Sequence, residues 1–387
     1  MKKVRIGILG VGNMGKNHSK ILSENQVEGA VLTAVSDTNP ERFAHIRENY
    51  PGVKTFDTAA EMYKSGEIDA VIIATPHYEH PAQAIEALDH NIHVMCEKPA
   101  GVFTKNVREM NEKAEEADPV FAIMFNQRTN PVYKKMREMV TNGELGEIKR
   151  TNWIITNWFR TQHYYDSGDW RATWAGEGGG VLINQCPHNL DLWQWICGMP
   201  SKVTAFCHEG KWHNIEVEDD VTAYVEYPNG ATGVFVTTTA DAPGTNRFEI
   251  TGEKGKLVCD DSKLTFYKLK TPVKELIFEN KQSFVTQEYD VMDIDTSGEN
   301  PQHKGTLAAF VANILHGKPL VAEGWEGINS LTLSNAMYLS SWLGKSISLP
   351  LDEDLFHEEL SKRIRSSKYV KNSGPVADED LSTSFGN

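Results

Sequence analysis

The stretch "GILGVGNMGKNH", residues 7–18, constrains the fold of this chain more than any other. A short apolar run there ends in three glycines, Gly10, Gly12 and Gly15, with the spacing G-x-G-x-x-G. Between a strand and a helix, such glycines allow a tight turn, a close approach of the backbone to a pyrophosphate, and close packing of helix on strand. The N-terminus of the following helix supplies amide donors to the anion. The stretch therefore predicts a strand–loop–helix unit that binds a dinucleotide.

A second apolar run, "VLTAVSD", ends on an acid, Asp37. It lies about 20 residues after the glycines, which is the spacing of an acid that accepts hydrogen bonds from the adenosine ribose. Because a carboxylate there would repel a 2′-phosphate, Asp37 favours NAD over NADP. Arg42, five residues later, is a guanidinium that would accommodate that phosphate, so NADP stays open as the less favoured cofactor. The other residues expected to border the cofactor are Asn13, Met14, Thr75 and Pro76.

Strand-like and helix-like runs alternate over the first 125 residues. Strict alternation implies right-handed crossovers and a parallel sheet with helices on both faces. Residues 1–125 are therefore predicted to form an α/β Rossmann domain with a doubly wound parallel sheet. The five expected strands are "VRIGILG", "VLTAVSD", "AVIIATP", "HVMCEK" and "VFAIMFN".

The pattern changes after residue 125. A helical run and the strand "EIKRTNWIIT" precede an aromatic, glycine-rich segment, and "VLINQCPHNLDLWQWICG" is predicted to be helical. Several strands then follow one another between residues 201 and 270 with a "PNG" turn between two of them, which indicates antiparallel pairing. Residues 126–370 are predicted to form an α+β domain with an open, mainly antiparallel sheet, for substrate binding and oligomerisation. Residues 371–387 are small, polar and acidic, and we expect a loosely held tail.

Size and composition restrict the class of protein. A chain of 387 residues exceeds a single core, so two domains are expected. The net charge of -14 argues against a nucleic-acid partner, which would need basic patches. No apolar run approaches ~18 residues and no signal-peptide core is present, so we expect a cytoplasmic protein without a membrane partner. Five scattered cysteines without a C-x-x-C pair suggest neither disulfides nor a zinc site, and no metal is expected.

Three motifs in sequential order give the chain a family resemblance. They are the glycine loop, "CEKPAG" with Glu97 and Lys98 at a strand end, and "GGGVLINQCPHNLDLW". Together with an x-N-x-R-like segment, "FNQR", they make the chain resemble the glucose-fructose oxidoreductase / inositol dehydrogenase (Gfo/Idh/MocA) family over nearly its whole length. The resemblance implies an NAD-dependent oxidoreductase of carbohydrate metabolism. It would transfer a hydride between nicotinamide and a secondary alcohol or ketone of a sugar, glycoside or cyclitol.

The resemblance also implies roles for two side chains. Lys98 of the E-K-P motif lies, in relatives, near both the nicotinamide and the substrate hydroxyl, and His188 stands at the position of the usual proton acceptor. Histidine suits that task because its pKa is near neutrality without perturbation. Many relatives carry an aspartate four residues before the histidine, whereas this chain has Asn184, which cannot accept a proton. On a helix, Asn184 and His188 would share one face, with Asp191 as the nearest acid.

The aromatic segment 153–174 indicates the substrate class, since aromatic rings stack on the C–H faces of sugars. A neutral sugar or cyclitol is favoured over a phosphate or nucleotide sugar, because only two arginines stand out there. The residues expected to contact substrate are Arg160, His163, Tyr164, Arg171, Trp174 and Asn184.

Two other functions stay open at this point. One is an enzyme of the same fold that retains NAD and cleaves glycosides through a transient oxidation, and the other is a non-catalytic NAD-sensing regulator. Whichever function holds, we expect a homodimer or homotetramer, because the strands "DVTAYVEY" and "TGVFVTTT" carry apolar, Thr or Tyr side chains on both faces.

Overall fold

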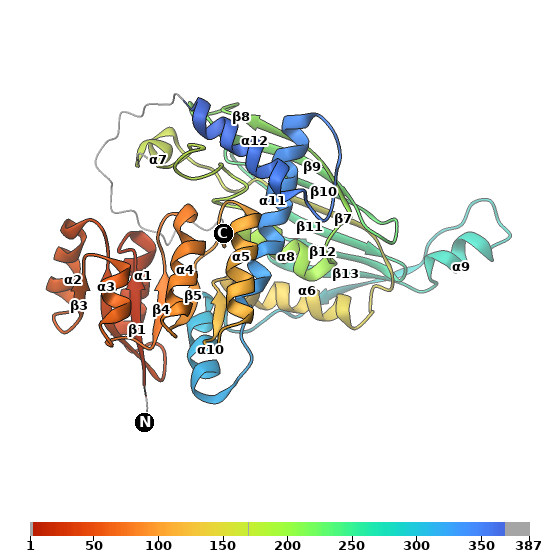
Figure 1. The fold of residues 1–387 in the computed structure, drawn as a ribbon. Coiled ribbons are helices and arrows are strands. Elements are labelled where there is room, and N and C mark those ends of the chain that lie inside the picture. The colour runs from red at the N-terminus through yellow and green to blue at the C-terminus, as the bar shows by residue number, and fades with distance from the viewer. Residues whose placement is uncertain (1–2, 169, 368–387) are drawn as a thin grey trace.

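The computed structural model describes residues 3–168 and 170–367, and it contains two sheets (Figure 1). The expected tail, residues 371–387, lies outside the described residues. No helix in the described ranges has the length and apolar character needed to cross a membrane.

The first sheet has six parallel strands in the order β3-β2-β1-β4-β5-β6, which confirms the doubly wound fold. The strands are β1 (Val4–Leu9), β2 (Ala30–Ser36), β3 (Lys54–Phe56), β4 (Ala70–Ile73), β5 (His93–Cys96) and β6 (Phe121–Ile123). The helices of this part are α1 (Asn13–Ser23), α2 (Phe43–Asn49), α3 (Ala59–Lys64), α4 (His80–Asp89) and α5 (Thr104–Glu115), with short 3-10 turns η1 (Pro40–Arg42) and η2 (His77–Glu79). Only β3 was not expected, because this short edge strand carries no apolar run.

The second sheet has nine strands in the order β14-β13-β12-β11-β7-β10-β9-β8-β15. All neighbours are antiparallel except β7 and β10, which are parallel, so the prediction of a mainly antiparallel sheet is confirmed. The strands are β7 (Ile148–Ile155), β8 (Lys202–Glu209), β9 (Glu218–Glu226), β10 (Thr232–Thr238), β11 (Asn246–Gly252), β12 (Gly255–Asp260), β13 (Lys263–Leu269), β14 (Tyr289–Ile294) and β15 (Ile347–Ser348).

The two faces of this second sheet differ in burial. One face buries a cross-strand row in which Trp153 of β7 stands between Phe235 and Phe248. The opposite face leaves large apolar side chains exposed on the neighbouring strands, among them Phe206 at 62% and Tyr224 at 42%. The sheet therefore has one core face and one open face, as the alternation in the sequence predicts.

Helices cover the core face of the second sheet. In α6 (Pro131–Thr141), Tyr133 contacts Trp153; in α8 (Pro187–Cys197), Trp193 stacks on Phe235; and α11 (Gly327–Leu343) packs on β8. The helix α12 (Glu353–Ser366) packs on α11 and α5, and the short α7 (Gln162–Asp166) follows β7. The 3-10 turns η3 (Asn126–Thr129) and η4 (Gly324–Glu326) lie at the junction with the first sheet. The predicted helix over 181–198 is too long at its start, because α8 begins at Pro187. Asn184 lies in the turn before it, so the expectation that Asn184 and His188 share one helix is wrong.

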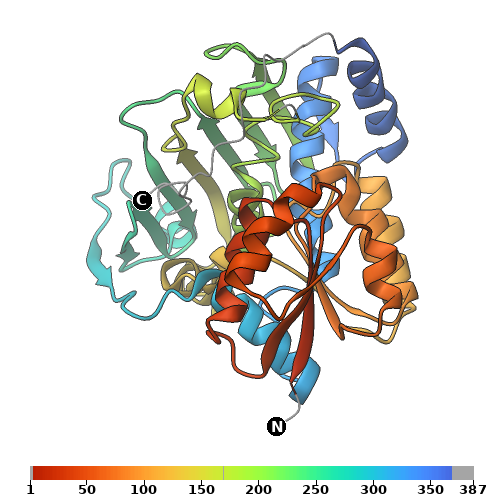
Figure 2. The ribbon, with the colours of Figure 1, turned by 90° about the vertical axis from the view of Figure 1, so that its left-hand side faces the viewer.

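A helix from the last third of the chain packs against the first sheet. Leu307, Phe310 and Val311 of α10 (Gln302–His316) join a buried cluster with Ile6 and Ile8 of β1. Figure 2 shows α10 in light blue beside the red strands at the N-terminus. Residues 126–370 are thus not confined to the second sheet.

The segment between β13 and α10 projects from the molecule. Its helix α9 (Val273–Phe278) has no buried residue, and Figure 1 shows it standing apart from the two sheets. Two of its phenylalanines are among the most exposed apolar side chains of the described residues, Phe278 at 81% and Phe284 at 93%. The sequence did not predict this extension.

Candidate active site

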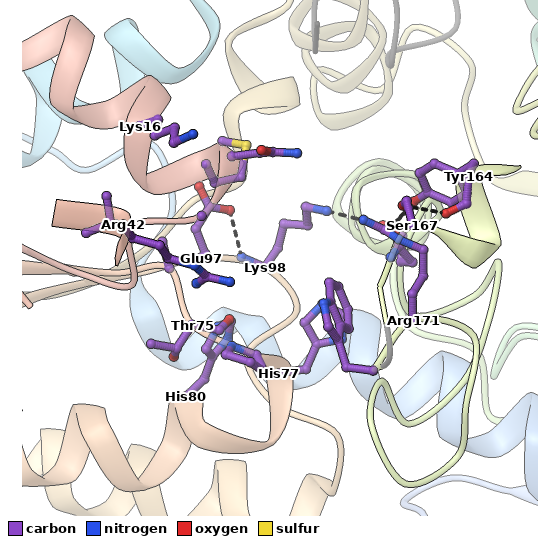
Figure 3. Close-up of a pocket in the computed structure, with 18 of the residues that line it drawn as sticks. Lys16, Arg42, Thr75, His77, His80, Glu97, Lys98, Tyr164, Ser167 and Arg171 are labelled. Carbon is purple, nitrogen blue, oxygen red and sulfur yellow. Dashed lines mark hydrogen bonds between the residues drawn. The ribbon is translucent and has the colours of Figure 1, made fainter. Parts of the chain in front are cut away.

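A cavity of about 890 Å³ lies where the carboxyl ends of β1, β4 and β5 face the segment 158–171 and the start of α8. Most of the side chains expected to act on cofactor or substrate meet there, and Figure 3 shows Lys98 extending across it towards Tyr164 and Arg171. Those lining it are Gly12, Asn13, Met14, Thr75, Pro76, Glu97, Lys98, Arg160, Tyr164, Arg171, Asn184 and His188.

The glycine loop has the geometry that a pyrophosphate requires. Gly10 has a φ of +91°, a conformation that favours glycine, and a Cβ at Gly15 would collide with the carbonyl oxygen of Gly10. A Cβ at Gly12, in contrast, would meet only Arg42, at 4.0 Å, so the backbone there faces open space at the cavity wall. The loop thus leaves room for a ligand next to the first amides of α1, and the residues present fit NAD.

Asp37, directly after β2, lies next to the glycine loop. Its Oδ1 accepts a hydrogen bond from the N–H of Asn39 at 2.8 Å, and its Oδ2 accepts one from the N–H of Val11 at 2.7 Å. Arg42 Nη1 also reaches Oδ2 at 3.1 Å, so the guanidinium forms an ion pair with the acid. Asp37 is buried behind the cavity wall, and Arg42 lines the cavity.

Glu97 is held by a histidine from the helix that follows the glycine loop. Its Oε1 lies 2.8 Å from Nε2 of the buried His18, and its Oε2 accepts a hydrogen bond from the N–H of Lys98 at 3.2 Å. Burial alone would raise the pKa of Glu97, but the hydrogen bond and charge of His18 bring that pKa down to about 2. The carboxylate therefore fixes the backbone from which Lys98 projects.

Lys98 connects the two halves of the cavity. Its Nζ donates to the carbonyl oxygen of Asn184 at 3.2 Å. Burial lowers the pKa of Lys98, and the nearby charges of Glu97 and Glu177 act against this effect. An ammonium has three hydrogens, so this contact leaves two for a ligand in the cavity.

His188 is a buried histidine at the cavity wall. It is 3% exposed, and neither of its ring nitrogens has a hydrogen-bond partner among the described residues. Burial, and next the charge of Lys98, lower its pKa well below the usual imidazole value. A buried polar group without a partner is costly, which indicates that these nitrogens serve a ligand. The lowered pKa favours the neutral ring of His188, and this ring lines the cavity.

Asn184 stands at the centre of a directed hydrogen-bond network. Its Oδ1 accepts from the hydroxyl of Tyr164 at 3.3 Å and from Gln185 Nε2 at 3.0 Å, and its Nδ2 donates to the carboxylate of Glu177. Arg171 Nη1 donates to the same tyrosine hydroxyl. The network gives the amide a defined orientation.

Asp191, the nearest acid on α8, forms an ion pair with Arg128 and not with His188. Both of its oxygens accept from the guanidinium of Arg128, at 2.7 and 2.8 Å, and Glu326 binds the same guanidinium at 2.9 Å. All three side chains hold η3, α8 and η4 together, so Asp191 acts in the junction between the two sheets.

Two of the expected substrate residues lie elsewhere. The side chain of His163 is exposed and does not line the cavity, and Trp174 is buried against Tyr338 and Trp342. Trp174 is thus a core residue, the alternative that holds for many tryptophans in aromatic-rich segments.

Several cavity residues were not identified from the sequence. Among them are Lys16, Trp158, Ser167, Trp170, Gln185 and His303. His303 lies on α10, far along the chain from every motif, and burial lowers its pKa to about 4. Only Trp158 and Trp170 had a sequence signal, because both belong to the aromatic segment.

Two family models match the chain. The model described as "Oxidoreductase family, NAD-binding Rossmann fold" matches residues 4–125, and the "GFO/IDH/MocA C-terminal domain" model matches residues 133–258.

Curated proteins and solved structures give similar matches. The chain is 24% identical to myo-inositol 2-dehydrogenase of Thermotoga maritima, over 89% of this chain and 98% of that protein. It is 27% identical to D-glucoside 3-dehydrogenase of Escherichia coli, over 89% and 97%. The match to the rhizopine catabolism protein MocA of Rhizobium meliloti, at 29%, covers only 51% of this chain and 58% of that relative. The WlbA dehydrogenase from Bordetella pertussis, solved with NADH and UDP-GlcNAcA, superposes with a TM-score of 0.77 at 28% identity, over 91% of this chain and 99% of that one.

Proposed function

This chain belongs to the GFO/IDH/MocA family of NAD-binding oxidoreductases, and from that premise we propose that it oxidises a secondary alcohol of a sugar, glycoside or cyclitol with His188 as the base. The observation that carries the proposal is the pair of unpartnered ring nitrogens of the buried His188 at the cavity wall. When bound, NAD⁺ supplies the hydride acceptor.

His188 takes the hydroxyl proton onto a ring nitrogen. Its lowered pKa, caused first by burial and then by Lys98, keeps the ring neutral at neutral pH, so a ring nitrogen offers a lone pair to that proton, although as a weaker base than an ordinary imidazole. In the reverse direction the same nitrogen returns the proton to a carbonyl oxygen. No acid on α8 assists it, because Asp191 is bound by Arg128.

Lys98 orients the substrate oxygen. One of its ammonium hydrogens is used by the carbonyl of Asn184, and the other two face the cavity. A positive charge at this place stabilises the negative charge that develops on the substrate oxygen as its proton leaves. The Glu97–His18 contact fixes the start of the lysine side chain.

The substrate class follows from the other cavity residues and from the relatives. Trp158, Trp170 and Tyr164 offer aromatic faces, and Asn184, Gln185 and Ser167 offer hydrogen-bonding groups for hydroxyls. Relatives are named for inositol and glucosides, which are neutral polyols. We therefore propose a neutral sugar or cyclitol.

Self-association is proposed through the open face of the second sheet. Ile154, Phe206 and Tyr224 are exposed on this face, at 41%, 62% and 42%. A row of this kind on neighbouring strands is an apolar surface that a second copy of the chain would cover. Light scattering at micromolar concentration should give the mass of a dimer or tetramer, and the mass of a monomer would contradict the proposal.

The test of the function is a substrate panel. Purified protein and NAD⁺ are mixed with cyclitols, neutral sugars, uronates and glycosides, and absorbance at 340 nm reports NADH. We expect NADH with a neutral polyol, and strongly reduced NADH formation in the His188→Ala variant. Release of free sugar from a glycoside without net NADH would support the NAD-retaining alternative. Tight NAD binding without any turnover would support the regulatory one.

A further inference from the structure

One buried carboxylate next to the cavity has no role in the mechanism above. Glu177 lies in the glycine-rich segment before α8 and is 1% exposed. It does not line the cavity, because Asn184 stands between them. Its Oε1 accepts from Asn184 Nδ2, and its Oε2 accepts from the N–H of Ala172 at 2.6 Å.

The contact with Asn184 settles which way the amide points. Only the NH₂ group can face a carboxylate, and the opposite oxygen then accepts from Tyr164 and Gln185, which both present donors. The contact with Ala172 has a second effect, because this alanine has a φ of +53°, which is uncommon for a residue with a Cβ. Glu177 thus braces the turn that follows Arg171.

The same carboxylate acts on the lysine. Lys98 Nζ rests on the backbone carbonyl of Asn184, whose side chain is bound by Glu177. The charged groups that act on Lys98 are Glu97 and Glu177, which favour its charged form, and Arg160 and Arg171, which oppose it. The histidines coupled to it are His77, His80, His188 and His303. Glu97 is already bound by His18. Of the two acids that favour the charged form of Lys98, Glu177 is therefore the one on the substrate side.

We propose that Glu177 is a positioning residue of this active site: it fixes the amide of Asn184, on whose backbone carbonyl Lys98 rests, and places a second negative charge, after that of Glu97, near the ammonium of Lys98. The inference rests on the proposed function for its catalytic consequence, and on the contacts and charges around Lys98 for its effect on that side chain.

The contact can be broken and rebuilt by two nearly isosteric substitutions. In Glu177→Gln, the amide oxygen can still accept from Ala172, but its NH₂ meets the NH₂ of Asn184, donor against donor. In Asn184→Asp, two carboxylates meet. In the double variant, the NH₂ of the new glutamine donates to the new aspartate, so the hydrogen bond returns in the reverse direction and one negative charge remains.

The first measurement needs no substrate. The pH dependence of Lys98 acylation by a small anhydride, followed by mass spectrometry on the full-length protein, gives the apparent pKa of its amine. We expect Glu177→Gln to lower it by about one unit, the scale for loss of a nearby opposite charge, and the double variant to restore it. An unchanged value in Glu177→Gln would overturn the proposal.

Glu218→Gln is the matched control for this titration. Glu218 is also fully buried and accepts from the N–H groups of Gly180 and Leu182, but burial raises its pKa to about 8. Glu218 is therefore mostly uncharged at neutral pH, and its replacement should leave the apparent pKa of Lys98 unchanged. Thermal unfolding of each variant verifies that it folds.

The second measurement is turnover. Each single variant should lower kcat by about tenfold or more, whereas the double variant should recover most of the loss, because directly contacting residues couple on this scale. Unchanged NADH affinity, measured by fluorescence, separates this effect from a cofactor defect. If the fold loss in kcat of the double variant equals the product of the two single losses, the proposal is overturned. A wild-type protein inactive on every polyol would reject the proposed function instead, and the Lys98 titration would still decide the role of Glu177.

Discussion

Lys98 Nζ, at the end of β5 in the first sheet, donates to the carbonyl oxygen of Asn184, which precedes α8 under the second sheet, at 3.2 Å. The lysine is therefore held from both sides of the cavity, by the Glu97–His18 contact at its backbone and by Asn184 at its tip. His188 lines the same cavity with both ring nitrogens available.

Loss of either proposed catalytic side chain should affect turnover and not cofactor binding. Lys98→Ala and His188→Ala should each lower kcat by roughly 10²-fold or more, the usual scale for a positioned acid–base group. NADH affinity, measured by fluorescence titration, should stay nearly unchanged. His208→Ala, an exposed histidine of β8, is the control. Wild-type turnover in His188→Ala would show that another residue is the base.

The acidic limb of the pH–rate profile should lie below the ordinary imidazole range. Burial, then Lys98, lowers the pKa of His188, so the ring stays neutral as the pH falls past about 6.5. Oxidation should persist below that pH and decline only as His188 becomes protonated. In Lys98→Met, which removes the neighbouring charge, the limb of the residual activity should move upwards. A wild-type limb at or above pH 6.5 contradicts this assignment.

Cofactor choice should depend on the Asp37–Arg42 pair. Asp37→Ala removes the carboxylate that we expect to accept from the adenosine ribose, and it releases Arg42 from its ion pair. We expect weaker NAD binding and a relaxed discrimination against NADP, both measurable by calorimetry. The double variant Asp37→Ala/Arg42→Ala should lose NAD affinity without the gain for NADP. Wild-type protein that prefers NADP would show that Asp37 does not select the cofactor.

The free energy of unfolding should depend on pH through the titration of Glu218. Burial raises the pKa of Glu218 from the ordinary value of 4.5 to about 8, although the hydrogen bond from Tyr338 acts in the opposite direction. Between these values the folded state keeps the proton and the unfolded state loses it, so this group costs wild-type stability as the pH rises through that window. The free energy of unfolding of Glu218→Gln, relative to wild type, should therefore increase from pH 5 to pH 8 in urea titrations. A difference that does not vary with pH would mean that Glu218 is ionised in the folded protein.

The nucleotide-binding half was predictable because its signals are local. Gly10 and Gly15 have backbone requirements that depend on contacts within the loop itself, and Asp37 follows directly from the end of β2. The sequence shows all of these as a spacing. The fold class and the family resemblance, which rest on such motifs, are confirmed.

The substrate half was less predictable because its residues meet only through tertiary packing. Glu177 lies in a glycine-rich loop without periodicity, and His303 comes from a helix whose pattern indicates only a buried stripe. The apolar run after Gly180 looked helical as far back as Val181, yet the helix begins at Pro187, where proline suits a first turn. The spacing of four residues between Asn184 and His188 therefore does not correspond to one helical turn, because Asn184 lies before the helix.

The packing of α10 on the first sheet has a consequence for how the chain is made. Translation proceeds at about 5 to 20 residues per second, so roughly 10 to 40 s separate the completion of β6 from that of α10. For that time the nucleotide-binding half has left the ribosome without the helix that covers Ile6 and Ile8. The order of synthesis and the order of packing differ, and a cell that makes this protein must keep that apolar surface from other chains until the last third has emerged.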